Sequence, residues 1–207
     1  MSALADSRNS REAILDAAEI AFAQRGFDGT TISDICAEAE VSRGLPSYLF
    51  GSKDALYRAV VGRAAQDLRS TVSEPLRRCA KKGSLENVLG FCIQTYLEYL
   101  ERNPRVVRLL QWEMLAAGSE MSPNSQPFAP SSELFGELLA ILEPVFLRNR
   151  RSRLDARNAL SSIVSLCFFP FMSGFATQTF GAASVHSLDV RKRSHAIARL
   201  LFRGILS

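Results

Sequence analysis

Six side chains of this 207-residue chain have the widest chemical range, because thiols and imidazoles can bind metals, attack substrates or change oxidation state. They are Cys36, Cys79, Cys92, Cys167, His186 and His195. The cysteines form no CxxC pair, the histidines have no cysteine or carboxylate pattern around them, and the sequence contains no GxSxG, HExxH or glycine-rich phosphate loop. We therefore expect neither an enzyme nor a metal or cofactor site. A redox sensor at Cys36, Cys92 or Cys167 stays an alternative to inert core thiols in a reducing cytosol.

The charged residues offer a second kind of chemistry, binding to a polyanion, but they are unevenly distributed. The chain holds 25 Lys or Arg and 21 Asp or Glu, a net charge of +4. Residues 1–54 contain five basic and nine acidic residues, which gives −4, and the remainder contains 20 and 12, which gives +8. A nucleic-acid contact in the N-terminal segment must therefore come from a few well-placed cations, backbone amides and helix termini rather than from a broadly basic face.

Helical patterns account for the N-terminal segment. An apolar stripe ends at Gly26, and Thr31 with Asp34 forms a T-x-x-D capping box that starts the next helix. Ser42 is expected to cap a third, short helix and Ser52 a fourth, long one. Two short helices separated by about four residues are typical of a helix-turn-helix.

The remaining chain also follows a helical period, and no alternating pattern of useful length predicts a strand. Helices are expected at residues 84–100, from 104 onward, and at about 132–150, 155–181 and 187–206, with a proline-containing loop at 118–132. We therefore predict an all-α protein. It has a three-helix helix-turn-helix head at residues 1–51 and a C-terminal helical bundle at 52–207.

Residues 11–57 resemble the N-terminal head of the tetracycline-repressor (TetR) family of bacterial transcription regulators. The marks are a first helix ending in RGF, a TT-xx-DI start of the second, VSRG opening the third, and LF-x-SK-xx-L leading into the fourth. These markers keep their order and spacing over 47 residues. The resemblance implies a homodimeric transcription regulator that binds double-stranded operator DNA and responds to a small molecule.

The resemblance also implies a recognition helix over residues 42–49, with Leu45 and Leu49 turned inward. The residues expected at the DNA are Thr30, Thr31, Ser42, Arg43, Gly44, Ser47, Tyr48 and Lys53. Arg43 is the outward side chain that can form two hydrogen bonds to guanine, and Gly44 lets the backbone approach. Thr30, Thr31 and Lys53 lie at helix N-termini, where phosphate contacts set the register of the protein rather than its sequence preference.

Two positions depart from the family pattern. Glu40 stands where the family often has glycine, and a side chain in a left-handed conformation costs on the order of 1 kcal/mol, so we expect the turn to differ locally. Pro46 follows Leu45 where the pattern usually continues to tyrosine. If Ser42 is the N-cap, Pro46 lies in the first turn, where the helix loses only its earliest hydrogen bond.

Large apolar side chains on the C-terminal helices predict a binding pocket. In the family that the head resembles, these helices surround a small-molecule effector, which we expect here to be apolar or amphipathic. The candidate contact residues are Phe91, Tyr96, Trp112, Phe168, Phe171, Met172 and Phe175. Core packing also accounts for large apolar residues on helices, so both interpretations stay open.

The stretch from Asn158 to Leu188 contains no charged residue, counting His186 as neutral, and follows four arginines within residues 148–153. An uncharged stretch that follows a group of arginines is a pattern typical of a membrane anchor. Its serines, threonines and Pro170 favour instead a helix buried on several faces, without a membrane contact.

The last two helical stretches carry more apolar surface than one small domain hides, which predicts a homodimer through a four-helix bundle. The apolar residues concerned are Leu160, Ile163, Val164, Ile197, Leu200, Leu201 and Ile205.

Together these features predict a cytoplasmic, ligand-responsive DNA-binding regulator. It would be a repressor that leaves its operator when an effector favours a different separation of two heads. The competing class is a helical small-molecule carrier or sensor that binds no DNA, with a membrane-tethered regulator as a variant. The acidic head favours the carrier, and the ordered head motif favours the regulator.

Overall fold

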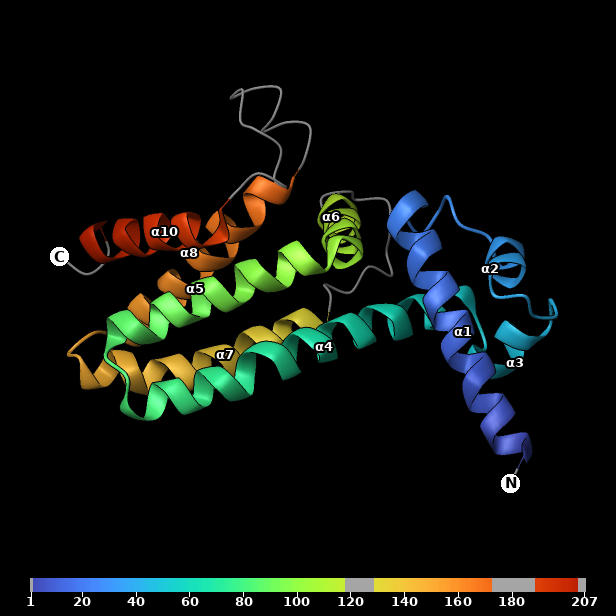
Figure 1. Cartoon of the computed structure of the whole chain (residues 1–207), viewed down its shortest axis with the longest axis horizontal. Coiled ribbons are helices and arrows are strands. Elements are labelled where there is room, and N and C mark those ends of the chain that lie inside the picture. The colour runs from blue at the N-terminus through green and yellow to red at the C-terminus, as the bar shows by residue number, and fades with distance from the viewer. Residues whose placement is uncertain (1, 118–128, 173–188, 205–207) are drawn as a thin grey trace. The chain divides into compact units, whose positions relative to one another are not determined.

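Helices form the regular structure of the computed structural model, which describes residues 2–117, 129–172 and 189–204 (Figure 1). The elements are α1 (Ser2–Arg25), α2 (Ile32–Glu38), α3 (Leu45–Phe50), α4 (Lys53–Lys82), α5 (Leu85–Arg102), α6 (Pro104–Ala117), α7 (Ala129–Arg148), α8 (Arg153–Phe168), the 3₁₀ turn η1 (Phe169–Phe171) and α10 (Val190–Gly204). The helical periodicity of the sequence is thus realised throughout the described ranges, and the prediction of an all-α protein is confirmed.

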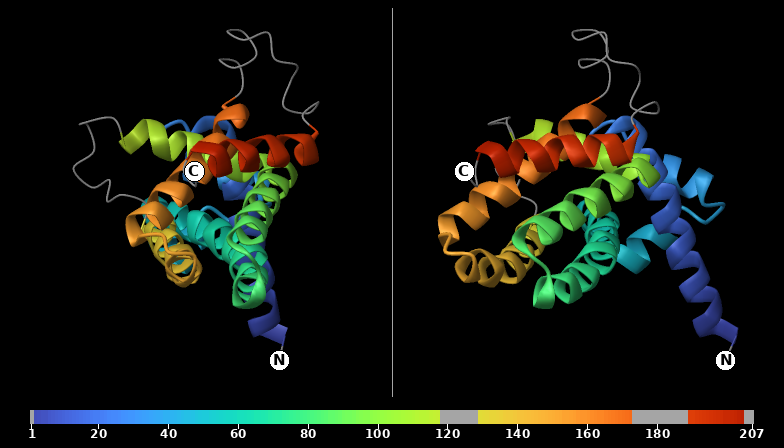
Figure 2. Two further views of the ribbon diagram at one scale, coloured as in Figure 1. Left: turned by 90° about the vertical axis from the view of Figure 1, so that its left-hand side faces the viewer. Right: turned by 60° about the vertical axis from the view of Figure 1, so that its left-hand side comes forward.

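The described helices gather into two compact units. The first unit comprises Met1–Gln66 with Arg105–Pro130, and so contains α1 to α3, the start of α4 and most of α6. The second unit comprises Asp67–Pro104 with Ser131–Ser207, and holds the rest of α4, α5, most of α7, α8 and α10. Within the second unit, α10 packs along α5, and both helices contact α8 (Figure 2).

Phe22 of α1 lies at the centre of the core of the first unit. Its ring is fully buried, stacks on Phe27 with centroids 6.2 Å apart, and meets Tyr57 edge to face at 4.9 Å. Ile14, about two turns away on the same stripe of α1, is also fully buried, and Leu109 of α6 joins the same cluster. The apolar stripe expected on the first helix therefore forms the core that positions α2 and α3.

Local signals in the sequence end and start helices where expected. Gly26 has a φ of +71°, a conformation open to glycine, and its N–H donates to the carbonyl four residues earlier at 2.9 Å, which closes α1. Thr31 Oγ1 accepts from the Asp34 N–H at 3.1 Å, and the Asp34 carboxylate accepts from the Thr31 N–H at 3.0 Å. These hydrogen bonds hold the pKa of Asp34 below its usual value. Ser52 likewise accepts from the N–H three residues later, at 3.1 Å, and caps α4.

The third helix begins at Leu45, later than the Ser42 start that the sequence indicated. A helix starting at Ser42 needs the N–H of residue 46 to bond to the Ser42 carbonyl, and Pro46 has no N–H. That carbonyl instead accepts from the Leu45 N–H at 3.1 Å in a turn, and an α-type bond follows from Tyr48 to Gly44 at 3.0 Å. Gly44 is the N-cap. The predicted Ser42 cap is therefore wrong, while the position of Pro46 in the first turn is confirmed.

Glu40 adopts a left-handed backbone conformation, with a φ of +53°, in the turn between α2 and α3. The turn closes through the Val41 N–H, which donates to the Cys36 carbonyl at 3.0 Å. Glu40 therefore keeps the left-handed conformation that glycine adopts more easily. The folded protein bears the steric strain between the Glu40 Cβ atom and the backbone.

We expect Glu40→Gly to stabilise the first unit by up to about 1 kcal/mol, because glycine adopts a positive φ without a Cβ clash. The larger freedom of glycine in the unfolded chain offsets part of this gain. Urea unfolding followed by the fluorescence of Trp112, the one tryptophan of the chain and part of the first unit, measures the change. Glu40→Ala is the control, since it keeps the Cβ atom. An equal gain from alanine would show that backbone strain is not the cause.

Helix α8 ends at Phe168, earlier than the predicted end near residue 181. Pro170 has no N–H to donate to the Leu166 carbonyl, so α-helical bonding stops and the chain continues as the turn η1. The Leu166 carbonyl instead accepts from Arg193 Nη2 at 3.3 Å. Residues 173–181 of the predicted helix lie outside the described residues. Within the ranges that the structure describes, none of the helices has both the length and the apolarity needed to cross a membrane.

The apolar residues of the last two helices are mostly buried within a single chain. Those that expose 4% of their surface or less are Leu160, Ile163, Ile197 and Leu201. The expectation that these four need a second copy to cover them is therefore wrong. Among the described residues of α8, η1 and α10, the large apolar side chains that remain exposed are Leu154, Phe169 and Leu200, at 63%, 44% and 64%. Val164 is half-buried, and Ile205 lies outside the described residues.

Candidate nucleic-acid interface

The helix-turn-helix exposes its polar residues on α3 and on the turn that leads into it. The exposed residues are Arg43, Gly44, Ser47 and Tyr48, together with Ser42 at the start of the turn. Tyr48 keeps 85% of its surface accessible. Leu45 and Leu49 pack against the core of the first unit, as predicted. The short helix α3 is thus held by its leucines and presents polar groups outward.

Arg43 has the chemistry to read a base. Its side chain is exposed, and the ion pairs found in the described part of the first unit engage other arginines. The Arg43 carbonyl accepts a weak hydrogen bond from Cys36 Sγ at 3.9 Å, which fixes the backbone behind the side chain. Gly44 beside it has no atom within 4 Å of the place where a Cβ would stand. The guanidinium and the adjacent backbone are therefore open to a partner such as the edge of a guanine.

Two of the three residues expected at phosphate are accessible, and the third is not. Thr31 is exposed at the start of α2, and Lys53 is partly exposed at the start of α4, with its Nζ 4.3 Å from the centre of the Phe27 ring. Thr30 is 1% exposed, and its hydroxyl lies 3.1 and 2.8 Å from two carbonyl oxygens of α1 and its C-terminal turn, to which it donates. Thr30 therefore stabilises the turn before α2, and the expectation that its side chain contacts phosphate is wrong.

Arg11 of α1 contacts α3, which the sequence did not predict. Its guanidinium carbon lies 5.0 Å from the centre of the Phe50 ring, and its Nη1 lies 3.6 Å from the Glu12 carboxylate. Phe50 is the last residue of α3, so this cation–π contact ties the end of α3 to α1. No sequence pattern links the two residues, because their pairing depends on how α1 crosses α3.

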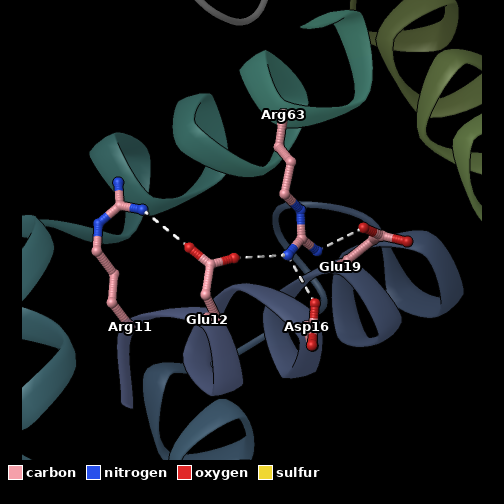
Figure 3. A network of polar contacts seen from close by, with 5 residues as sticks. All are labelled: Arg11, Glu12, Asp16, Glu19 and Arg63. Carbon is pink, nitrogen blue, oxygen red and sulfur yellow. Dashed lines mark hydrogen bonds and ion pairs between the residues drawn. The ribbon is translucent and has the colours of Figure 1, made fainter. Parts of the chain in front are cut away.

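The acidic side chains of α1 converge on one arginine of α4 (Figure 3). Arg63 Nη1 lies 2.6 Å from Asp16 and 3.5 Å from Glu12, and Nη2 lies 2.6 Å from Glu19. Burial by itself lowers the pKa of Arg63, but the bonds to Glu19 and Asp16 outweigh it and raise the pKa. The acidic residues of the segment 1–54 that form ion pairs are Glu12, Asp16, Glu19, Asp34 and Asp54. Much of the negative charge of the head is thus neutralised internally, and it does not by itself oppose a polyanion.

Trp112 of α6 belongs to the first unit and packs on α1. Its Nε1–H donates to the Ala23 carbonyl at 3.2 Å, and its ring covers Gly26, where an added Cβ would come within 3.0 Å of Trp112 Cδ2. The next residue, Glu113, accepts from the Tyr57 hydroxyl. Burial raises the pKa of Tyr57, and this hydrogen bond raises it further. These contacts tie α6 to α1 and α4, and a ligand contact of Trp112 stays a prediction.

The other candidate ligand contacts lie in the second unit, except Phe175, which lies outside the described residues. Phe91 and Tyr96 are half-buried on α5, Phe168 is buried at the end of α8, and Phe171 and Met172 follow it, partly buried. Their joint contact with a ligand stays a prediction. Among the residues described, no group of three or more His, Cys, Asp or Glu is arranged to hold a metal ion.

Comparisons of the sequence and of the structure with known proteins find the same kind of protein. Residues 14–60 match a family described as bacterial regulatory proteins, tetR family, and residues 86–199 match the tetracyclin repressor-like C-terminal domain. The HTH-type transcriptional repressor NicS of Pseudomonas putida is 28% identical over 168 residues, which cover 77% of this chain and 74% of NicS. The repressor SCO4008 of Streptomyces coelicolor is 29% identical over 119 residues, 58% of this chain and 57% of that protein. A TetR-family regulator of Mesorhizobium loti shares the fold, with a TM-score of 0.70 at 16% identity over 95% of this chain and 96% of the other.

Proposed function

Because the chain belongs to the tetR family of bacterial regulatory proteins and is a DNA-binding helix-turn-helix regulator of that family, we propose that it is a homodimeric repressor released from a double-stranded operator by a small-molecule effector. The observation that carries the proposal is the exposed polar side of α3, with Arg43 and Tyr48 free to meet DNA. The similar proteins NicS and SCO4008 are transcriptional repressors, which supports repression rather than activation by this protein. DNA binding would reside in residues 1–51, and effector binding and dimerisation in 52–207.

In this proposal α3 enters the major groove of the operator. The Arg43 guanidinium would bond to O6 and N7 of a guanine, and Ser47 and Tyr48 would reach neighbouring bases or phosphates. Ser42 and Gly44, in the turn before α3, would bring the backbone close to the DNA. Thr31 and Lys53 at the starts of α2 and α4 would fix the register on the phosphates.

We expect Lys53→Ala to weaken binding to all DNA sequences alike, because a phosphate contact carries no sequence information. The loss of one such contact should lower the magnitude of the slope of log affinity against log salt concentration by about 1. Titration of an operator duplex and a random duplex over a series of salt concentrations measures both quantities. Lys81→Ala, an exposed lysine at the other end of α4, is the control that should leave the slope unchanged. A change in base preference with Lys53→Ala would contradict the phosphate role.

Dimerisation is proposed through α8 and α10, and we expect light scattering at micromolar concentration to give twice the chain mass of 22.8 kDa. The exposed residues of α8 from Asn158 onward carry no charge, so a second copy can cover them without desolvating an ion. Leu200, 64% exposed on α10, lies in the same proposed interface, and Leu200→Glu should shift the mass toward the monomer. His195→Gln, a polar exchange at an exposed position of α10, should not. A monomeric wild-type protein would overturn this part of the proposal.

The effector would act by favouring a different separation of the two DNA-binding heads. In this proposal α6 would pass such a change to the head, since the chain runs from α5 through Asn103 into α6, and Trp112 and Glu113 bind α6 to α1 and α4. The coupling free energy between effector binding and operator binding should be roughly 1–3 kcal/mol. The effector then lowers the affinity for the operator by a fixed factor, and operator DNA must lower the affinity for the effector by the same factor. Paired titrations of effector with and without operator test this. A ligand that binds without any change in operator affinity would contradict it.

A further inference from the structure

We propose that one end of the second unit docks on the surface of an anionic membrane, through the lipid headgroups. This end, which we call the basic end, comprises residues 77–83 at the end of α4 and 147–157 around the turn between α7 and α8. The contact is peripheral, needs no membrane-spanning helix, and departs from the sequence-based expectation of no membrane contact. It uses none of the residues assigned to DNA, and it ends before Asn158, where the proposed dimer face begins.

The two segments of the basic end are joined by hydrogen bonds. Arg148, the last residue of α7, donates from Nη2 to the carbonyl oxygens of Ala80 and Gly83, at 3.2 Å in each case. The turn after α7 is held by its own backbone, because the Arg151 N–H donates to the Phe146 carbonyl at 2.9 Å. The end of α4 and the turn between α7 and α8 accordingly lie at the same end of the second unit (Figure 1). Their side chains therefore contribute to one surface.

The basic end carries all of the net positive charge of the chain. Its two segments contain nine Lys or Arg and one Asp, a charge of +8. The rest of the chain then holds 16 of the 25 basic and 20 of the 21 acidic residues, which gives −4. Arg77 and Arg153 form ion pairs with glutamates. The cations that are exposed, and that have no acidic partner among the described residues, are Arg78, Lys81, Lys82, Arg148, Arg150 and Arg157.

Stabilisation of the helices does not account for all of these cations. Lys81, Lys82 and Arg148 lie in the last turns of α4 and α7, where the helix dipole favours positive charge. Arg153 and Arg157 lie instead within the first five residues of α8, where the same dipole disfavours positive charge. An anionic partner at the basic end would offset this unfavourable placement.

Two exposed leucines lie among the cations and favour a lipid surface as the partner. Leu147 and Leu154 flank the turn between α7 and α8 and keep 49% and 63% of their surface accessible. An anionic membrane offers phosphate groups to the cations and, directly behind them, hydrocarbon to the leucines. A duplex offers phosphates without such hydrocarbon. Neither segment contains an aromatic residue, the type that commonly anchors protein interfaces and single-stranded nucleic acids.

Flotation of the full-length protein with vesicles tests the proposal. Vesicles of equal parts phosphatidylglycerol and phosphatidylcholine are compared with vesicles of phosphatidylcholine alone. We expect at least about tenfold stronger binding to the anionic vesicles, since each cation near such a surface contributes about fivefold. Rising salt concentration should release the protein, because salt screens exposed charges.

A pair of double variants locates the contact on the chain. Arg78→Gln combined with Arg150→Gln removes two exposed cations of the basic end, one from each segment, and should weaken binding to anionic vesicles by more than about tenfold. Arg102→Gln combined with Arg105→Gln is the control. It removes the same charge at exposed positions around the junction of α5 and α6, and should leave the binding unchanged. Circular dichroism checks that both variants fold.

A tryptophan in place of Leu154 shows whether the leucines reach the hydrocarbon. With brominated lipid chains in the anionic vesicles, the fluorescence of Leu154→Trp should be quenched more strongly than that of the wild-type protein. The wild-type signal comes from Trp112 of the first unit and supplies the background. Equal quenching of the two proteins would contradict insertion at the basic end.

The contrary outcomes are distinct. Absence of binding to anionic vesicles, equal binding to neutral vesicles, or binding that survives Arg78→Gln with Arg150→Gln would each overturn the membrane contact. Should the protein ignore vesicles but bind a random DNA duplex or poly-glutamate through Arg78 and Arg150, the partner would be a nucleic acid or an acidic protein, and the membrane assignment would be wrong.

Discussion

Phe22→Ala is expected to destabilise the first unit by about 3–5 kcal/mol, the range measured when a fully buried aromatic ring is removed. The Phe22 ring has no exposed surface and meets the rings of Phe27 and Tyr57, so alanine leaves a cavity and removes two aromatic contacts. A loss of this size is a large part of the roughly 5–15 kcal/mol by which folded domains are stable. DNA binding should be lost together with the fold of the head.

Urea unfolding followed by Trp112 fluorescence measures this loss, because the indole packs on α1 within the same unit. Tyr48→Ala is the matched control. Tyr48 is an aromatic residue of the head that is 85% exposed, so its removal should change stability by about 0.5 kcal/mol or less while lowering DNA affinity. Equal destabilisation by Phe22→Ala and Tyr48→Ala would show that the described core does not hold the head together.

Arg43→Ala is expected to cost about 1–3 kcal/mol on the preferred operator and to relax discrimination at one base pair of each half-site. The reason is that the exposed guanidinium at the start of α3 can form two hydrogen bonds to a guanine, and alanine can form none. Binding of a set of duplexes, each altered at one base pair, measures the affinity and the discrimination together. Stability should change little, because Arg43 is exposed and makes no contact in the core.

Arg43→Lys separates the charge of the side chain from its geometry. Lysine keeps the positive charge but lacks the planar pair of donors, so non-specific affinity should be kept and discrimination reduced. Should Arg43→Ala instead weaken binding to every sequence equally and leave the base preference unchanged, Arg43 would be a phosphate contact, and the assigned reading of guanine would be wrong.

Features of the head that depend on residues a few positions apart could be predicted from the sequence. Thr31 and Asp34 form their capping box, Gly26 ends α1 with a positive φ, and Leu45 and Leu49 face the core as expected. Each of these depends on backbone geometry within about one helical turn, which residue type and spacing encode directly. The exposed positions of Arg43 and Tyr48 follow once the inward face of α3 is known.

Contacts between distant parts of the chain could not be predicted in this way. Arg63 collects the carboxylates of α1 from residues 44 and 47 positions away, and Trp112 donates to a carbonyl 89 positions away. Such contacts depend on how helices cross, which hydrophobic periodicity does not specify. The burial of Thr30 is a case of the same kind, since a polar residue at a helix start gives no sign that its hydroxyl bonds back to the preceding helix.

The prolines are an intermediate case. Pro46 and Pro170 were visible in the sequence, but their effect lies in the hydrogen bond that each fails to donate. That missing donor moves the start of α3 from Ser42 to Leu45, and it ends α8 at Phe168. At Leu166 it also leaves a carbonyl for Arg193, a consequence that requires the position of α10 and so appears only in the structure.

The central claim is that α3 reads a specific DNA sequence in a dimeric regulator, and selection of bound fragments from random double-stranded DNA tests it most directly. The account predicts one enriched motif with two-fold symmetry, its half-sites spaced by about 10 base pairs or a multiple of this, as two heads in successive major grooves require. Repeating the selection with Arg43→Ala should return the same motif with one base pair of each half-site no longer preferred. A wild-type protein that enriches no motif, and retains fragments only weakly and without regard to sequence, would contradict the account.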